Sequence, residues 1–159
     1  MDRVRLRTNL NLDIYRDPSF WHNSDMSEFV RFVNHGASHI TPALVEQVMR
    51  HLPVWKAEFA QINAPSFPHL VDQLEFLADV VEDCFEGAYK DLPYMALAES
   101  VFALMYAHKK VDIIPDTMLQ IGRADDSSVV RAVLIQNESA FQKYAEANQV
   151  VWNTITSNP

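Results

Sequence analysis

The sequence predicts an all-α protein, a single-domain bundle of five to seven helices preceded by an extended arm. From residue 24 onward, apolar residues recur at helical spacing. The segment Leu92–Ala107 is apolar on nearly every face, which is typical of a helix enclosed by others. Only the first residues alternate with the period of a strand. With 159 residues, of which 48% are hydrophobic and 21% charged, the chain fits one globular domain.

Residues 1–23 form the predicted arm. Between positions 4 and 14 the apolar residues fall on even numbers, whereas Arg3, Arg5 and Arg7 fall on odd ones, as in a half-buried strand. No other segment alternates as well, so a sheet partner within the chain is hard to find, and an unpaired strand edge leaves backbone groups unsatisfied. Three arrangements stay open: a hairpin turning near Thr8-Asn9, pairing with a second copy of the chain, or an extended arm laid across the helices.

Residues 24–159 are predicted to form the helical domain, and two helices open it. The first helix can be capped by Ser24 or Asp25, and Gly36 is expected to end it. Thr41-Pro42, a capping residue followed by proline at the first helical position, begins the second helix. Pro53 either kinks this helix or restarts it. The inward positions are Met26, Phe29, Val30 and Val33, followed by Leu44, Val45, Val48, Met49 and Leu52.

Three longer helices follow. The segment Pro68–Glu86 is the clearest amphipathic helix, and Gly87 ends it. Leu92–Ala107 is expected to be the central helix, and Ser127–Ile155 one long final helix. The amphipathic helix has the inward face Leu70, Val71, Leu74, Leu77, Val81 and Phe85 and the polar face Asp72, Glu75, Asp79, Glu82 and Asp83.

Charge and composition limit the partners and the compartment. The formal net charge is −8 and the isoelectric point about 5.1, so the surface repels phosphate backbones and anionic lipid. We therefore expect no nucleic acid and no membrane as partners. No apolar run reaches the ~20 residues that a spanning helix needs, and residues 1–9 lack the apolar core of a secretory signal. The single cysteine, Cys84, cannot form an internal disulfide, and a cytoplasmic protein fits best.

The connection between the last two predicted helices, Lys109–Asp126, is strongly acidic. Carboxylate oxygens are the ligands that Mg²⁺ or Ca²⁺ prefers, and Gly122 would let the chain fold back to bring the acidic groups together. A structural interpretation is favoured, in which the aspartates cap helix starts or fix a turn. In this structural interpretation, Asp116 caps a short helix over 117–121, and Asp125 or Asp126 caps the long final helix. The candidate metal ligands are Asp112, Asp116, Asp125 and Asp126.

The same region carries a family resemblance. The segments that carry it are Asp91-Leu92-Pro93-Tyr94, Ala103-Leu104-Met105-Tyr106, Val111-Asp112-Ile113-Ile114-Pro115-Asp116, Gln120-Ile121-Gly122, Asp125-Asp126 and Val129-Val130. With this spacing, residues 91–134 resemble the YkvA-like domain of unknown function that is found in many bacterial proteins. The resemblance covers somewhat more than a quarter of the chain. It implies a helical domain and supplies no reaction.

Three other groups of residues are candidates for a function. His35 and His39 are four apart, but the predicted helix end at Gly36 lies between them, so a zinc site is disfavoured. Cys84 lies among acidic residues, which raise a thiol pKa and make a nucleophile improbable. Glu99, in the apolar central helix, needs a partner. The candidate partners are Arg123, Arg131 and a tyrosine hydroxyl.

The leading functional hypothesis is a non-enzymatic helical module that acts through protein–protein contact, with itself through the N-terminal arm. This hypothesis depends on two observations: the arm alternates like a strand but has no evident sheet partner in the chain, and the sequence lacks a catalytic signature. No cofactor is expected. The alternative is a divalent-cation-binding protein or a metal-dependent enzyme that uses the acidic connection 112–126.

Overall fold

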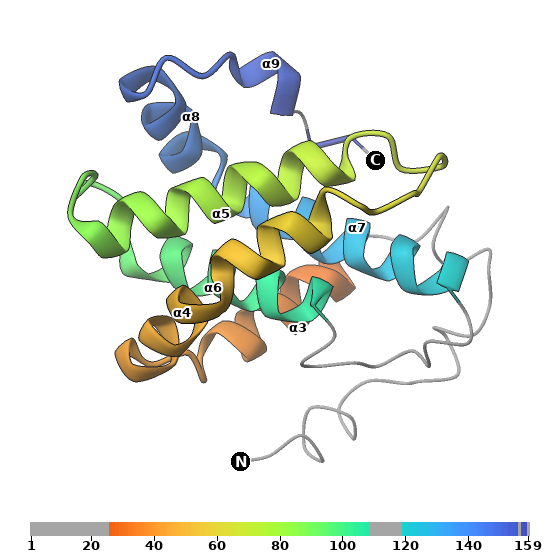
Figure 1. The fold of residues 1–159 in the computed structure, drawn as a ribbon, viewed down its shortest axis with the longest axis horizontal. Coiled ribbons are helices and arrows are strands. Elements are labelled where there is room, and N and C mark those ends of the chain that lie inside the picture. Colours follow the sequence, from red (N-terminus) through yellow and green to blue (C-terminus); the bar gives the residue numbers. More distant parts are fainter. Residues whose placement is uncertain (1–25, 109–118, 156, 159) are drawn as a thin grey trace.

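Every element that the structure describes is an α-helix, as the sequence predicts (Figure 1). This computed structural model describes residues 26–108, 119–155, 157 and 158, and within the helices the side chains of 119–125, 153 and 154 are not described. The predicted arm, residues 1–23, lies outside the described residues, as do the candidate caps at 24 and 25.

Helices α3 (Ser27–Ala37) and α4 (Pro42–Phe59) follow one another through a short turn, and both pack on α6 (Tyr94–Ala107). The predicted cap of α4 is confirmed, because Thr41 Oγ1 accepts a hydrogen bond of 3.2 Å from the backbone N–H of Leu44. Pro53 neither ends nor restarts α4, which is continuous through this exposed position. Gly36 is not the stop of α3 but lies inside it.

Helix α5 (Leu70–Glu86) is the predicted amphipathic helix, and Gly87 ends it in the left-handed conformation, with φ of 80°. Its buried surface is wider than the predicted stripe. The additional residue Phe76 meets three aromatic rings from the last two helices, those of Phe141, Tyr144 and Trp152. Phe85, predicted to face inward, is 47% exposed.

Helix α6 (Tyr94–Ala107) is the central helix, as predicted. It packs against α3, α4, α5 and α7, and ten of its residues are buried. Its contact with α3 is close, because the ring of Phe102 lies directly against the backbone at Gly36. Even so, the described part of the chain contains no helix with both the length and the apolarity needed to cross a membrane.

The single long final helix was a wrong prediction. The chain instead forms α7 (Leu119–Gln136), α8 (Glu138–Ala147) and α9 (Trp152–Ile155). The first break is at Asn137, whose φ and ψ are −116° and 25°, and the second contains Gln149 with a positive φ of 58°. These breaks turn α8 and α9 back over α5, where Phe141, Tyr144 and Trp152 reach Phe76 (Figure 1).

Candidate functional site

The structure describes only part of the predicted acidic site. Asp112 and Asp116 lie outside the described residues, and Asp125 is described only as a helical residue. The side chain of Asp126 is buried, with 1% exposed. In the described ranges, no group of three or more His, Cys, Asp or Glu side chains is placed to hold a metal ion.

The capping role predicted for Asp125 or Asp126 is wrong. Helix α7 begins at Leu119, so both aspartates lie within the helix and not at its N-terminus. The turn predicted at Gly122 is wrong for the same reason, because the helix passes through it. Residues 119–126 include several good helix formers, and they extend the helix upstream of the apolar stripe that marked its predicted start.

A histidine and a glutamate that are distant in the sequence meet where α6 ends. His108 Nε2 lies 2.6 Å from Glu58 Oε2, and the imidazole is stacked on the indole of Trp55 with ring centroids 4.3 Å apart. His108 Nδ1 is buried and hydrogen-bonds no other described residue. This arrangement fixes the end of α6 against α4. Because His108 and Glu58 are 50 residues apart, no local signal in the sequence could have found the pair.

The two histidines at the end of α3 do share a face, which corrects the prediction. Their ring centroids are 5.1 Å apart and the rings meet edge to face. The reason is that Gly36 is helical and the chain stays helical at Ser38, so residues four apart come together. Within the described residues His35 and His39 gain no third metal ligand.

Cys84 has the environment that the sequence predicted. Its side chain is partly buried on α5, and burial together with the charge of Asp83 raises the pKa of the thiol to about 11. The thiolate is the reactive form of cysteine, and it is scarce at neutral pH when the pKa is this high. Cys84 is therefore a packing residue.

Glu99 is buried, as expected, with 1% of its side chain exposed. The neighbouring groups that favour its charged form are the side-chain amides of Asn137 and Gln136. Arg131 instead donates to the backbone carbonyl of Ser157 at 2.8 Å. The side chain of Arg123 lies outside the description.

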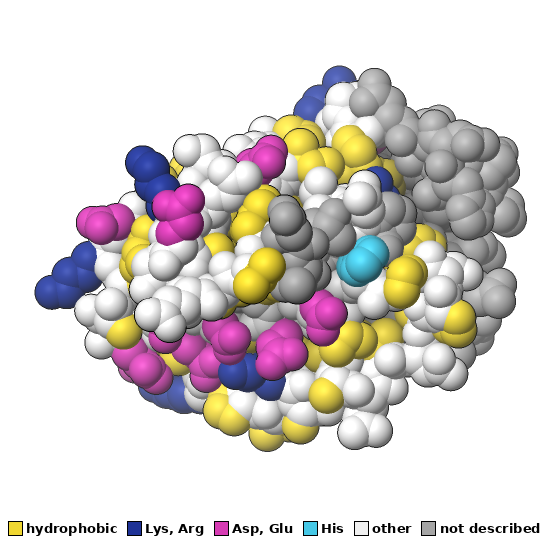
Figure 2. Space-filling model, turned by 90° about the horizontal axis from the view of Figure 1, so that it is seen from above, with side chains coloured by type: hydrophobic (Ala, Val, Ile, Leu, Met, Phe, Trp, Pro, Cys, Tyr) yellow, Lys and Arg dark blue, Asp and Glu magenta, His cyan; other side chains and the backbone are white. Residues whose placement is uncertain are grey.

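The outer side of α5 is strongly acidic. Six carboxylates and no basic residue occur within Leu70–Glu86, and Figure 2 shows acidic side chains gathered along one edge of the molecule with basic ones between them. We call this surface the α5 acidic face. Its residues are Asp72, Glu75, Asp79, Glu82, Asp83 and Glu86.

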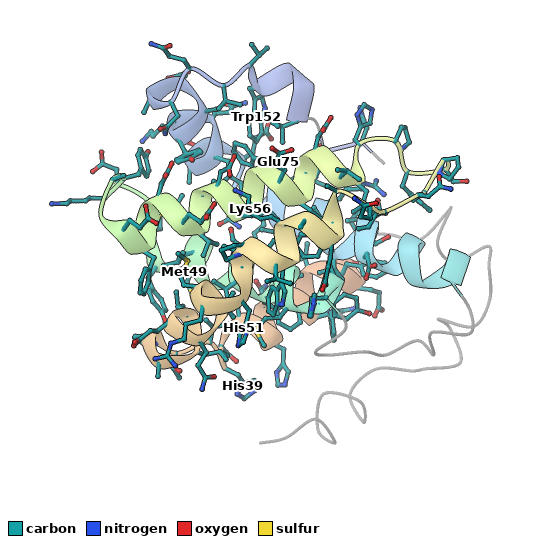
Figure 3. All side chains as sticks on the ribbon, viewed as in Figure 1. His39, Met49, His51, Lys56, Glu75 and Trp152 are labelled. Atoms are coloured by element: carbon teal, nitrogen blue, oxygen red, sulfur yellow. The ribbon has the colours of Figure 1, made fainter. Side chains whose placement is uncertain are left out.

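Two of these carboxylates hold a lysine from the neighbouring helix. Lys56 Nζ on α4 lies 2.9 Å from Asp79 Oδ1 and 2.7 Å from Glu82 Oε1, and Figure 3 shows Lys56 beside α5, where Glu75 lies further along. Partial burial alone would lower the pKa of Lys56, but the hydrogen bonds to Glu82 and Asp79 outweigh it and raise the pKa. The lysine stays charged and connects α4 to α5.

A third carboxylate of the face is used inside the fold. The hydroxyl of Tyr144 on α8 donates to Asp83 Oδ2 at 2.5 Å. Burial, followed by the bond to Asp83, raises the pKa of Tyr144, so the hydroxyl remains a donor. The other three carboxylates, Asp72, Glu75 and Glu86, are exposed and form no ion pair with a described residue.

Comparison of the chain with protein-family models, with curated proteins and with solved structures finds no match. The resemblance of residues 91–134 to the YkvA-like domain therefore stays a prediction. The case for a function depends on the described geometry and on the sequence of the arm.

Proposed function

We propose that this chain is a non-enzymatic helical module that associates with a second copy of itself, the N-terminal arm of one copy binding the α5 acidic face of the other. The observation that carries this proposal is the charge of α5, which has six carboxylates and no basic residue. Exposed like charges on successive turns of a helix repel one another, and a basic partner relieves that repulsion.

The arm has the complementary charge at a compatible spacing. Arg3, Arg5 and Arg7 alternate, so in an extended chain they would share one side at intervals of about 6.6 Å. Carboxylates three or four residues apart on a helix are spaced about 5–6 Å along its axis. The long, flexible arginine side chain covers the difference, and its guanidinium binds carboxylates with two parallel hydrogen bonds.

Lys56 supports this mode of binding from within the fold. Its ammonium lies between Asp79 and Glu82, which are three residues apart, at 2.9 and 2.7 Å. Asp72 and Glu75 repeat this spacing, and no described cation lies between them. A basic side chain from outside the helical domain would find the same pair of acceptors there.

The test is the mass of the full chain in solution, measured by light scattering and by sedimentation at low and high salt. We expect a dimer at low salt that dissociates as salt rises, because screening at 0.1 M acts over about 10 Å. Replacing Arg3, Arg5 and Arg7 together by glutamine should give a monomer. Replacing Asp72, Glu75 and Glu86 by their amides should do the same.

The matched control changes exposed carboxylates that are not part of α5, Asp91→Asn with Glu146→Gln, and should leave the dimer intact. Exchanging the charges, with acidic residues in the arm and lysines at 72, 75 and 86, should restore association. A monomer at every salt concentration, both with and without residues 1–23, would refute the proposal. So would a dimer that neither set of neutral substitutions weakens.

A further inference from the structure

Two carboxyl groups are buried among the described residues, that of Asp126 on α7 and that of Glu99 on the central helix α6. Glu99 is 1% exposed, and its Oε1 atom is enclosed without a hydrogen-bond partner among the residues described. An ionised carboxylate is costly to bury, and the cost grows when one of its oxygens accepts nothing. Burial accordingly raises the pKa of Glu99 above its ordinary value of 4.5, and hydrogen bonds from Asn137 and Gln136 offset only part of that rise.

Three helices meet through the amides around this carboxyl. Gln136 ends α7, Asn137 occupies the break before α8, and the Gln136 Nε2 atom also donates to Asn34 Oδ1 on α3 at 2.6 Å. Asn137 uses its own amide to bond the carbonyl of Val133 at 3.0 Å. A protonated Glu99 fits this amide-rich corner, because a neutral acid both donates and accepts.

Charged groups on the surrounding helices do not set the state of Glu99, because the causes of its pKa shift are burial and the two amides. Most of these groups have partners elsewhere or are exposed. They are Glu28, Arg31 and His35 on α3, Lys56 and Glu58 on α4, the α5 acidic face, Asp126 and Arg131 on α7, and Glu138 on α8.

The corner beside Glu99 is also where the helical backbone is interrupted. Asn137 lies outside helical geometry, between α7 and α8. Beyond it, α8 and α9 are attached to α5 through an aromatic cluster centred on Phe76, with Phe141, Tyr144 and Trp152 around it, and through the hydrogen bond from Tyr144 to Asp83. Moving this short segment outward would admit water to Glu99 without disrupting the packing of α3, α4 and α5 on α6.

We propose that Glu99 is a proton-operated latch: the neutral carboxyl holds the α7–α8 corner closed over the core, and its ionisation opens the corner and releases α8 and α9 from Phe76. This gives the module a pH-dependent conformation. It does not depend on self-association through the arm, and either proposal can fail without the other.

The direction of the pH effect follows from the two states. In the open state the carboxyl meets water and titrates near its ordinary value, whereas in the closed state the pKa is raised. The preference for the closed state is therefore complete below the ordinary value and is lost as pH rises through the closed-state pKa. Between the two values, the equilibrium constant for opening should rise about tenfold per pH unit.

The first test is hydrogen exchange of the backbone amides of α8, corrected for the intrinsic rate, between pH 5 and 8. In the wild-type protein we expect protection of α8 to fall by up to about tenfold per pH unit. Glu99→Gln, which keeps the neutral shape, should make α8 protection independent of pH. The control Glu138→Gln removes an exposed carboxylate at the same corner and should behave as wild type.

The second test follows the titration of the carboxyl directly. Carbon NMR of the full chain with labelled glutamate side chains should show one carboxyl that titrates above 4.5, assigned to Glu99 by its loss in the Gln variant. If every glutamate titrates at or below its ordinary value, the latch is refuted. Equal pH dependence of α8 protection in wild type and Glu99→Gln refutes it as well.

Discussion

The contact between α3 and α6 makes a sharp prediction for Gly36→Ala. In an ordinary helix this change stabilises by about 1 kcal/mol, because alanine has the higher helix propensity. Gly36 is helical and does not have the positive φ that would favour glycine. However, a Cβ at this position would overlap the Phe102 ring, with the Cδ1 atom at 2.5 Å.

The magnitude depends on whether the ring can move. Phe102 is 2% exposed and packs against Phe32 and Tyr106, with ring centroids at 5.3 and 6.1 Å, so any shift disturbs two further rings. Overpacking of such a core costs about 1–3 kcal/mol, and we take the upper part of that range. After subtracting the gain in propensity, Gly36→Ala should lower the free energy of unfolding by about 1–2 kcal/mol.

Urea unfolding followed by circular dichroism measures this change, and a double-mutant cycle with Phe102→Leu tests its cause. Leucine removes the ring atoms that overlap, so Gly36→Ala should be nearly neutral or stabilising in that background, with a coupling energy of about 1–3 kcal/mol. Ser139→Ala, at an exposed position of α8, controls for propensity alone. If Gly36→Ala stabilises the wild-type protein by about 1 kcal/mol, or if the coupling is zero, the steric argument is wrong.

Four further changes have definite expected outcomes. Thr41→Ala removes the cap of α4 and should cost about 1 kcal/mol in urea unfolding, whereas Thr41→Ser should retain most of the stability. Lys56→Met should lower stability by about 1 kcal/mol at low salt and by less at 1 M salt, since the ion pairs are partly exposed; equal losses at both would contradict this. Alkylation of the single cysteine at pH 8 should be about 100-fold slower than that of an ordinary thiol, because its pKa of about 11 is two units above 9.0; a rate like that of free cysteine would show the site to be open. Millimolar Mg²⁺ or Ca²⁺ should leave the melting temperature unchanged, and a rise that Asp116→Asn abolishes would instead favour the cation site.

Much of the helical framework could be predicted because its signals are local. The Thr41-Pro42 start and the Gly87 end are set by backbone chemistry within a few residues. The enclosure of α6 follows from a segment with almost no polar face. The helix breaks at Asn137 and Gln149 could not be predicted, because neither glycine nor proline marks them in the sequence. They are set by the docking of distant aromatic rings on Phe76, while the apolar period continues as if the helix were whole.

The candidate sites were harder to predict, since their partners are remote in the sequence. Glu99 could be identified by its apolar surroundings, but the arginines that seemed natural partners lie on a helix whose start and end were misplaced. Gly36 was taken for a helix end when its role is to let Phe102 approach. The pairing of His108 with Glu58 joins positions 50 residues apart, so only the packing of α4 on α6 reveals it.

The position of α6 explains why the polar residues it carries matter. The middle of a helix surrounded by four others is buried, so a polar group there must find a partner within the protein or remain uncharged. His108 meets the first requirement at the helix end, where Glu58 and Trp55 hold it. Glu99, in the middle of α6, meets the requirement for a partner only in part, because its Oε1 atom has no described hydrogen-bond partner. The free energy of keeping that carboxyl neutral therefore depends on pH, whereas the hydrophobic contacts around it do not. A change of pH thus acts on this helix through Glu99, and the part of the fold that can yield is the α7–α8 corner built over it.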